Sequence, residues 1–315
     1  MAVPIVALVG PTATGKSQLA VELALRLAES GQPAEVVNAD SMLVYRGMDV
    51  GTAKPTLAER RGVPHHLIDI LEVTEKASVA HFQTLARAVI AALRERGILP
   101  ILVGGSALYS RAILDRFEFP GSDDAVRERW QAELDRVGAE ELHARLTQIA
   151  PASAAHIEPG NGRRIVRALE VAELTGGHQP ELPEWTYELE GVHQFGLALP
   201  REELDRRIDE RVERMWAGGL VDEVRGLLAR DLRDGQTAVR AIGYRQVVSY
   251  LDGQITEQEA KQQVQRATRT FFRKQLSWYR RDPRIHWLTA GGPRNAELIA
   301  ATIGCEGRSH PQTAV

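Results

Sequence analysis

The chain has little of what builds disulfide-braced, zinc-braced or membrane-bound proteins. Its 315 residues include one cysteine, Cys305. A single thiol excludes a disulfide framework and a cysteine-based zinc module, and it is typical of a reducing compartment. No apolar run approaches the ~20 residues of a membrane-spanning helix, and Met1–Val9 lacks the basic start of a signal peptide. We therefore expect a cytoplasmic protein that does not contact membranes.

A large excess of positive charge is also absent, because the net charge is −3 at pH 7. This value argues against a uniformly basic nucleic-acid-binding protein. The charges are unevenly distributed, however. Residues 121–200 contain 7 basic and 14 acidic side chains, whereas residues 240–286 contain 10 basic and 4 acidic ones. A basic segment in an otherwise acidic protein requires a local explanation.

Strands and helices are predicted to alternate in the first third of the chain. Short apolar runs predict the strands and i, i+4 apolar spacing predicts the helices between them. The strands are Ile5–Val9, Glu35–Ala39 and Ile98–Val103, and the helices are Ser17–Ser30 and Ser78–Arg96. This alternation predicts an α/β fold with a parallel sheet and helices on both of its faces.

The pattern changes after residue 121. It is helical and acidic over Asp123–Thr175, a loop is predicted at Gly176–Glu184, and Val192–Leu199 predicts a strand that returns to the sheet. Residues 202–279 are mostly helical, and one short helix is expected after Gly291. We predict a catalytic core formed by residues 1–121 and 192–315, with basic C-terminal helices, and a helical insertion domain at 122–191. Two domains also agree with the chain length, which exceeds the ~250–300 residues at which a single hydrophobic core stops growing.

The strongest motif is a phosphate-binding loop between the first strand and the first helix. It matches G-x-x-x-x-G-K-[ST] and consists of Gly10, Pro11, Thr12, Ala13, Thr14, Gly15, Lys16 and Ser17. Glycines let the backbone N–H groups turn toward phosphate oxygens, and the helix N-terminus attracts the same anion. Lys16 supplies a positive charge, and the Ser17 hydroxyl can bind Mg²⁺. We predict a P-loop NTPase-like core that binds a phosphate or diphosphate; such loops are commonly ATP-binding sites.

The acidic residue that holds the metal in motor proteins and GTPases is missing from its usual place. The strand Ile98–Val103 ends in Gly104-Gly105-Ser106, without a carboxylate. Asp40 follows the second strand and lies where α/β sheets bind their ligands. It is either a helix N-cap or a general base that faces the phosphate site. A small-molecule kinase and another phosphate-ester transferase both remain open.

Seven stretches in order resemble the bacterial tRNA dimethylallyltransferases, also called tRNA isopentenyltransferases. They are Gly10–Ser17 (GPTATGKS), Asp40–Tyr45 (DSMLVY), Gly47–Pro55 (GMDVGTAKP), Pro64–Ile70 (PHHLIDI), Leu102–Ser106 (LVGGS), Arg164–Glu170 (RIVRALE) and Arg240–Arg245 (RAIGYR). The resemblance runs from about residue 4 to residue 288. It implies transfer of a dimethylallyl group from dimethylallyl diphosphate to N6 of the adenosine immediately 3′ of the anticodon, with release of diphosphate and with Mg²⁺ as cofactor.

The resemblance also implies roles for individual residues. Asp40 occupies the position of the base that accepts the amine proton, Lys16 and Arg211 act on the diphosphate, and Thr12 lines the donor pocket. Without the resemblance, Arg211 is interpreted as a surface charge on a helix that carries three other arginines. Ser106 matches a substrate-contacting position that is usually Thr, and this change keeps the hydroxyl.

The partner implied by the resemblance is the anticodon stem-loop of a tRNA, which the insertion domain contacts. We expect a monomer, because the sequence shows no extended apolar patch pattern. The matching positions are Asp40, Ser41, Met42, Leu43, Ser106, Arg127, Arg163, Arg164, Ile165, Val166, Arg167, Arg240, Ala241, Ile242, Gly243, Tyr244, Arg245 and Lys274. Arg163 stands where the family often has Gln. Independently of the resemblance, one helix face carries Arg266, Arg269, Arg273 and Lys274, and it is either an ordinary solvated face or a phosphate-contacting one.

Three other functions are consistent with part of these observations. An adenylate isopentenyltransferase acting on free nucleotides shares the loop and Asp40 but needs no RNA-binding surface. A small-molecule kinase explains the loop and leaves the basic segment 240–286 unexplained. An RNA-binding module switched by a nucleotide requires a metal-holding carboxylate, which is missing after Ile98–Val103.

Overall fold

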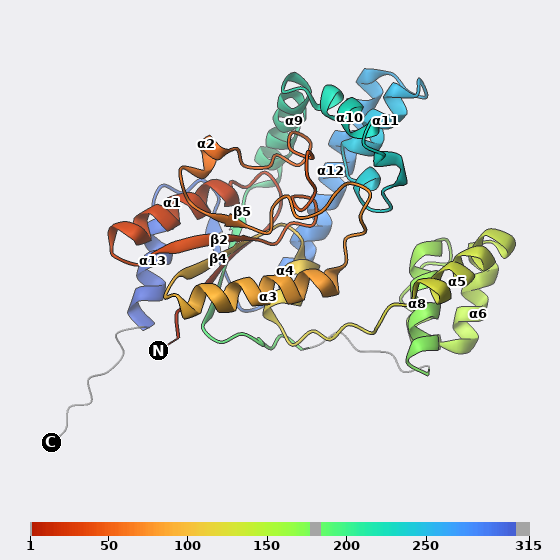
Figure 1. Ribbon diagram of the computed structural model, residues 1–315, viewed down its shortest axis with the longest axis horizontal. Helices are drawn as coiled ribbons and strands as arrows, with labels where there is room; N and C mark the ends of the chain where they lie inside the picture. The colour runs from red at the N-terminus through yellow and green to blue at the C-terminus, as the bar shows by residue number, and fades with distance from the viewer. Residues whose placement is uncertain (1, 177–183, 307–315) are drawn as a thin grey trace. The chain divides into compact units, whose positions relative to one another are not determined.

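The chain forms two compact units. The computed structural model describes residues 2–176 and 184–306. Unit 1 contains Met1–Asp115 and Tyr187–Val315, and unit 2 contains Arg116–Thr186 (Figure 1). Each unit has its own hydrophobic core. None of the helices in the described ranges is long and apolar enough to cross a membrane.

Unit 1 is an α/β unit. Its strands are β1 (Ile5–Val9), β2 (Ala34–Asn38), β3 (His65–His66), β4 (Leu99–Val103), β5 (Val192–Ala198) and β6 (Ile285–Thr289). Its helices are α1 (Lys16–Glu29), α2 (Leu57–Arg60), α3 (Val79–Glu95), α4 (Ala107–Leu114), α9 (Arg201–Ala217), α10 (Leu220–Leu228), α11 (Tyr244–Leu251), α12 (Glu257–Tyr279) and α13 (Asn295–Glu306). Two 3₁₀ helices, η1 (Leu232–Asp234) and η2 (Ala238–Arg240), connect α10 to α11.

The six strands form one parallel sheet in the order β3-β2-β4-β1-β5-β6. Strand β1 is an inner strand, with Val6 opposite Ile101 of β4 on one side and opposite His193 of β5 on the other. Because parallel strands point the same way, their carboxyl ends meet at one edge of the sheet. The segments that follow β1, β2 and β4 therefore converge there, which brings the phosphate loop, Asp40 and Gly104 to one place.

Helices cover both faces of the sheet (Figure 1). Ile5, Ala7 and Val9 of β1 belong to a core that includes residues of α3, α4 and α12, whereas Val6 and Leu8 belong to a second core with α1 and α13. A strand that is buried on both faces has no polar side, so it appears in the sequence as an uninterrupted apolar run. This is why the apolar runs predicted β1 and β4 successfully.

The loop between β2 and α2 packs against the C-terminal helices. Tyr45 and Met48 of this loop are fully buried in the same core as Leu220 of α10 and Tyr244 of α11. Burial of four large side chains contributes roughly 1.5–3 kcal/mol each. Residues 39–56 are therefore held firmly at the carboxyl edge of the sheet despite having little regular structure.

Unit 2 is a small helical unit whose helices are α5 (Asp124–Val137), α6 (Ala139–Ile149), α7 (Pro151–Ala154) and α8 (Gly162–Leu174). Its core contains Leu142, Leu146, Ile165 and Leu169. Glu170 is fully buried beside this core. It accepts a hydrogen bond from Arg127 Nε at 3.0 Å and forms an ion pair with Arg167 at 2.9 Å, which satisfies a carboxylate that would otherwise be costly to bury.

The predicted α/β core is confirmed, with a parallel sheet and helices on both faces. The division between the units falls at Arg116 and Thr186, rather than at residues 122 and 191. Its position follows from an antiparallel bridge between Asp115 and Tyr187, which keeps both residues in unit 1. The loop expected at Gly176–Glu184 lies almost wholly outside the described residues.

Several short elements escaped the sequence analysis. Strand β3 has two residues, and β6 (IHWLT) has mostly exposed side chains, so neither shows the apolar run of a buried strand. Helix α4 directly follows Gly105-Ser106, and α2 has four residues. Both helices are too short for a clear periodicity.

At the carboxyl edge of the sheet, Gly104 lies directly against the backbone of the segment that follows β2. A Cβ at Gly104 would lie 2.3 Å from the backbone oxygen of Ala39, the residue before Asp40. We expect Gly104→Ala to lower the free energy of unfolding by about 1–3 kcal/mol, because the clash is with backbone and cannot be relieved by a side chain.

Gly226 of α10 is a matched control, since it is exposed and a Cβ there meets nothing within 4 Å. Gly226→Ala should raise the stability by about 0.5–1 kcal/mol, because alanine favours the helix interior. Chemical denaturation of both variants measures the two effects. Equal stability of Gly104→Ala and the wild type would contradict the close approach of β2 and β4.

Candidate active site

The phosphate loop lies between β1 and α1, as predicted. Gly10 and Gly15 adopt positive φ angles of 122° and 83°, a region that other residues rarely enter. A Cβ on Gly10 would also approach the Leu197 backbone oxygen to 2.8 Å. The Thr14 hydroxyl donates to the Pro11 carbonyl at 2.8 Å, which closes the loop on itself. The free N–H groups at the start of α1 make this a site for an anion.

Lys16 is buried and points back into the loop. Its ammonium donates to the Pro11 carbonyl at 2.6 Å. Burial lowers the pKa of Lys16 from its usual 10.5 to about 7; the nearby Asp40 carboxylate opposes this change and the Arg211 guanidinium adds to it. An anion in the loop would raise the pKa again, because it stabilises the charged ammonium.

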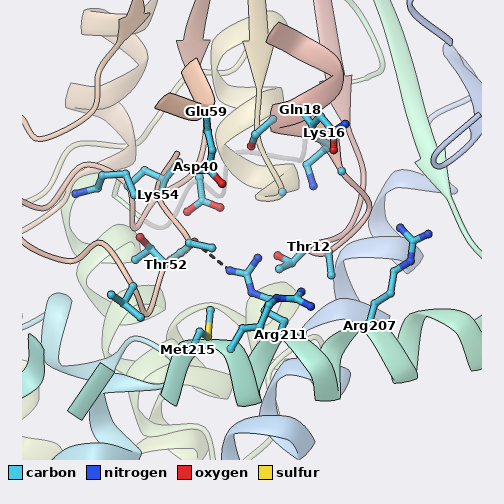
Figure 2. Close-up of a pocket in the computed structure, with 18 of the residues that line it drawn as sticks. Thr12, Lys16, Gln18, Asp40, Thr52, Lys54, Glu59, Arg207, Arg211 and Met215 are labelled. Carbon is cyan, nitrogen blue, oxygen red and sulfur yellow. Dashed lines mark hydrogen bonds between the residues drawn. The ribbon is translucent and has the colours of Figure 1, made fainter. Parts of the chain in front are cut away.

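Asp40 stands two residues beyond the end of β2. Its backbone N–H donates to the Asn38 side-chain oxygen at 2.7 Å, and its Oδ1 accepts from the Met42 N–H at 2.9 Å. The second bond makes an Asx turn, and no helix follows it, so the N-cap alternative does not describe this residue. In Figure 2 the carboxylate faces the same space as Lys16 and Arg211.

Arg211 comes from α9 and is half-buried rather than a surface charge. Its guanidinium donates to the Thr52 carbonyl at 3.0 Å (Figure 2). Burial lowers the pKa of Arg211 to about 10, while Asp40 opposes this change. The group therefore stays positive at neutral pH. It faces the phosphate loop across the cavity, in a position to bind the outer side of a phosphate.

Lys16, Asp40 and Arg211 line one cavity of about 880 Å³. Its lining includes the apolar residues Leu43, Val50, Val103 and Met215 as well as the charged residues at the phosphate loop. Such a cavity suits an amphipathic ligand that has an anionic head and a small hydrocarbon tail. The sequence analysis placed the anion here, but it gave no indication of the apolar side chains in the lining.

The residues at the loop fit a magnesium ion shared with a ligand. Within residues 2–176 and 184–306, no group of three or more His, Cys, Asp or Glu side chains could hold a metal alone. Mg²⁺ commonly keeps several waters and takes only one or two protein oxygens together with substrate phosphates. The exposed Ser17 hydroxyl at the start of α1 and the Asp40 carboxylate both line the cavity and are oxygen ligands of this kind.

The predicted tRNA-contacting residues of unit 1 differ in exposure. Arg240, Arg245 and Lys274 are exposed, and Ser41, Met42, Leu43, Ser106 and Ile242 are half-buried. Ala241, Gly243 and Tyr244 are buried, and the Tyr244 hydroxyl donates to Glu223 at 2.6 Å. The Tyr244 side chain therefore belongs to the core and does not form a contact surface.

The same division applies within unit 2 and on α12. Arg163 and Arg164 are exposed, whereas Ile165 and Val166 face the core of the helical unit. Arg127 and Arg167 hold Glu170. On α12, Arg269 forms ion pairs with Asp205 and Asp209 of α9, so the expected arginine face is partly neutralised.

The sequence analysis missed two residues that shape the site. Gln275 is buried, donates to the Gly105 carbonyl at 2.6 Å and accepts from the Thr12 N–H at 3.3 Å. A polar residue on the same face of α12 as Phe272 and Tyr279 was a signal for such a role. Lys54 donates to the Tyr45 carbonyl at 2.7 Å and pairs with Asp49 and Asp69.

Comparisons with known proteins agree with this geometry. A family model described as IPP transferase matches residues 43–282. The tRNA dimethylallyltransferase of Kineococcus radiotolerans is 62% identical over 290 residues, which cover 91% of each chain. That of Thermobifida fusca is 58% identical over 96% of this chain and 94% of its own. The crystal structure of a tRNA isopentenylpyrophosphate transferase from Bacillus halodurans matches with a TM-score of 0.69 at 40% identity, covering 96% of this chain and 98% of that one.

The lowered pKa of Lys16 makes anion binding dependent on pH. We expect the affinity for inorganic diphosphate to fall as the pH rises through about 7, because the free lysine loses its proton there and only the charged form attracts the anion. Lys16→Arg keeps its charge over this range. Since the ligand itself titrates, the ratio of the two dissociation constants is the informative quantity.

Calorimetric titrations of both proteins from pH 6 to pH 9 measure this ratio. The wild type should weaken relative to Lys16→Arg by up to roughly tenfold per pH unit above pH 7. A ratio that does not change with pH would show that the ammonium keeps its proton in the free protein.

Proposed function

Because the chain belongs to the IPP transferase family, we propose that it is a tRNA dimethylallyltransferase. It transfers the dimethylallyl group of dimethylallyl diphosphate to N6 of the adenosine immediately 3′ of the anticodon and releases diphosphate. The observation that carries this proposal is one cavity whose lining includes the phosphate loop, the Asp40 carboxylate and several apolar side chains. A small-molecule kinase does not require apolar side chains for a hydrocarbon tail beside its phosphate site.

The donor binds with its diphosphate in the phosphate loop. The N–H groups at the start of α1 bind the oxygens, and Lys16 and Arg211 neutralise charge from two sides. Leu43, Val50 and Met215 accommodate the dimethylallyl tail. Ser17, together with the diphosphate itself, would hold Mg²⁺, which when bound neutralises the charge that develops on the leaving diphosphate.

The reaction needs one proton acceptor. As the adenine N6 forms a bond to C1 of the dimethylallyl group, the bond from C1 to the diphosphate oxygen breaks and its electron pair leaves with the diphosphate. The N6 nitrogen then has one proton too many, and Asp40 accepts it. Lys16 and Arg211 stabilise the negative charge of the leaving group, which is greater in the transition state than in the bound donor.

The RNA reaches this site only if its target base leaves the stack of the anticodon loop. Arg240, Arg245 and Lys274 of unit 1 are exposed, as are Arg163 and Arg164 of unit 2. These side chains are suited to bind backbone phosphates. A free nucleotide would need neither set, so the exposed arginines favour tRNA over adenosine monophosphate as the acceptor.

A transfer assay with labelled dimethylallyl diphosphate tests this function, with unmodified tRNA and adenosine monophosphate as parallel acceptors. We expect label in tRNA only, and we expect Asp40→Asn to lower kcat by about 10²–10⁴-fold because it cannot accept the proton. The amide keeps an oxygen for the Met42 N–H, so donor binding should change only a few-fold.

Other outcomes of the assay contradict specific parts of the proposal. Label in adenosine monophosphate would assign the chain to nucleotide prenylation. ATP consumption without transfer would assign it to a kinase. Full activity of Asp40→Asn would exclude Asp40 as the base.

Ser17 allows a separate test of the metal site. Ser17→Ala removes the hydroxyl of the residue that directly follows Lys16 in the phosphate loop. We expect the Mg²⁺ concentration for half-maximal transfer to rise about tenfold, while kcat at saturating Mg²⁺ changes less. An unchanged Mg²⁺ dependence would show that this hydroxyl is not a ligand.

A further inference from the structure

The Glu223 side chain binds the backbone of a loop that lines the donor cavity. This residue lies in the first turn of α10, and its carboxylate accepts hydrogen bonds from three successive N–H groups. Oε2 accepts from Asp49 at 2.9 Å and from Val50 at 2.6 Å, and Oε1 accepts from Gly51 at 3.2 Å. Three adjacent N–H groups that converge on one carboxylate form an anion nest, and here the anion belongs to the protein.

The clamped loop is a wall of the cavity. Asp49, Val50, Thr52 and Lys54 all line the cavity that contains Lys16 and Asp40. The Thr52 carbonyl, one residue beyond the nest, accepts the hydrogen bond of Arg211. The position of this carbonyl therefore determines where the Arg211 guanidinium points.

Tyr244 completes the coordination of the same carboxylate. Its hydroxyl donates to Glu223 Oε1 at 2.6 Å, and its ring packs so closely on Gly51 that a Cβ there would lie 2.5 Å from the ring. Burial and the adjacent Glu223 raise the pKa of Tyr244, so the phenol remains a donor. Glu223 thus receives four hydrogen bonds, three from the loop and one from α11.

We propose that Glu223 is a positioning residue for the donor site: by clamping residues 49–51 it places the Thr52 carbonyl, which orients Arg211 toward the diphosphate. This inference rests on the proposed function for its kinetic readout, but its binding readout does not. Glu223 touches no reacting atom and acts through the loop.

The chemistry of the site requires a carboxylate. A glutamine has one acceptor oxygen and an NH₂ group, and in either orientation of the amide the NH₂ group would face at least one backbone N–H of the loop. Glu223→Gln therefore keeps the size of the side chain and weakens the clamp. Asp222→Asn is the matched control, because it removes a charge from the same helical turn but alters only an exposed ion pair with Arg225.

The first experiment measures calorimetric binding of inorganic diphosphate and transfer kinetics for the wild type, Glu223→Gln and Asp222→Asn. We expect Glu223→Gln to weaken diphosphate binding and to raise the KM for dimethylallyl diphosphate by about tenfold to a hundredfold. The KM for tRNA should change less than threefold, and Asp222→Asn should match the wild type. Unchanged diphosphate affinity in a folded Glu223→Gln protein overturns the inference.

Coupling to Arg211 separates positioning from a merely structural role. If Glu223 acts through Arg211, adding Glu223→Gln to Arg211→Ala should weaken diphosphate binding no further. Additive losses would show that Glu223 acts by another route. Tyr244→Phe removes one of the four hydrogen bonds, so it should produce a smaller effect of the same kind, and it serves if Glu223→Gln fails to fold.

These outcomes also distinguish the inference from the proposed function. Wild-type protein that binds diphosphate but labels no tRNA would contradict the function and leave the binding comparison intact. Active wild-type protein with a normal Glu223→Gln variant would contradict the inference alone.

Discussion

The site depends on two basic side chains, Lys16 and Arg211, that line one cavity together with Asp40. Lys16 and Arg211 are brought together by β1, α1 and α9, and burial lowers the pKa of each. Asp40 offsets only part of this electrostatic cost. Two hydrogen bonds offset another part of this cost, because the Pro11 carbonyl accepts from Lys16 and the Thr52 carbonyl accepts from Arg211. A bound diphosphate adds negative charge beside both side chains, so binding of the donor stabilises the folded protein.

Local sequence patterns predicted the parts of the molecule that local physics determines. The apolar runs of β1 and β4 and the periodicity of α1 and α3 found elements within one or two residues of their observed bounds, and the phosphate loop follows from its own residues. Arg211 could not be assigned from its helix, because only the tertiary fold turns it away from solvent. Tyr244 was placed among tRNA contacts by its motif, since a motif does not distinguish buried members from exposed ones.

Helix α12 shows why adjacent residues of one helix differ in role. Lys274 is exposed and Gln275 is buried against the phosphate loop, one residue apart. A helix turns by about 100° per residue, so adjacent positions face different surroundings. The exposed face of α12 is available to an RNA backbone while the buried face holds Thr12 and Gly105.

The strand order has a consequence for synthesis on the ribosome. β1 is made first, yet its neighbours β4 and β5 begin at Leu99 and Val192. Both edges of β1 therefore lack hydrogen-bonding partners until nearly a third of the chain has been synthesised. The edge that pairs with β5 lacks its partner until well over half of the chain has been synthesised. Arg211 emerges later still. The nascent N-terminal segment exposes an apolar, unpaired strand during that time, so cotranslational binding by chaperones would matter most for this part of the chain.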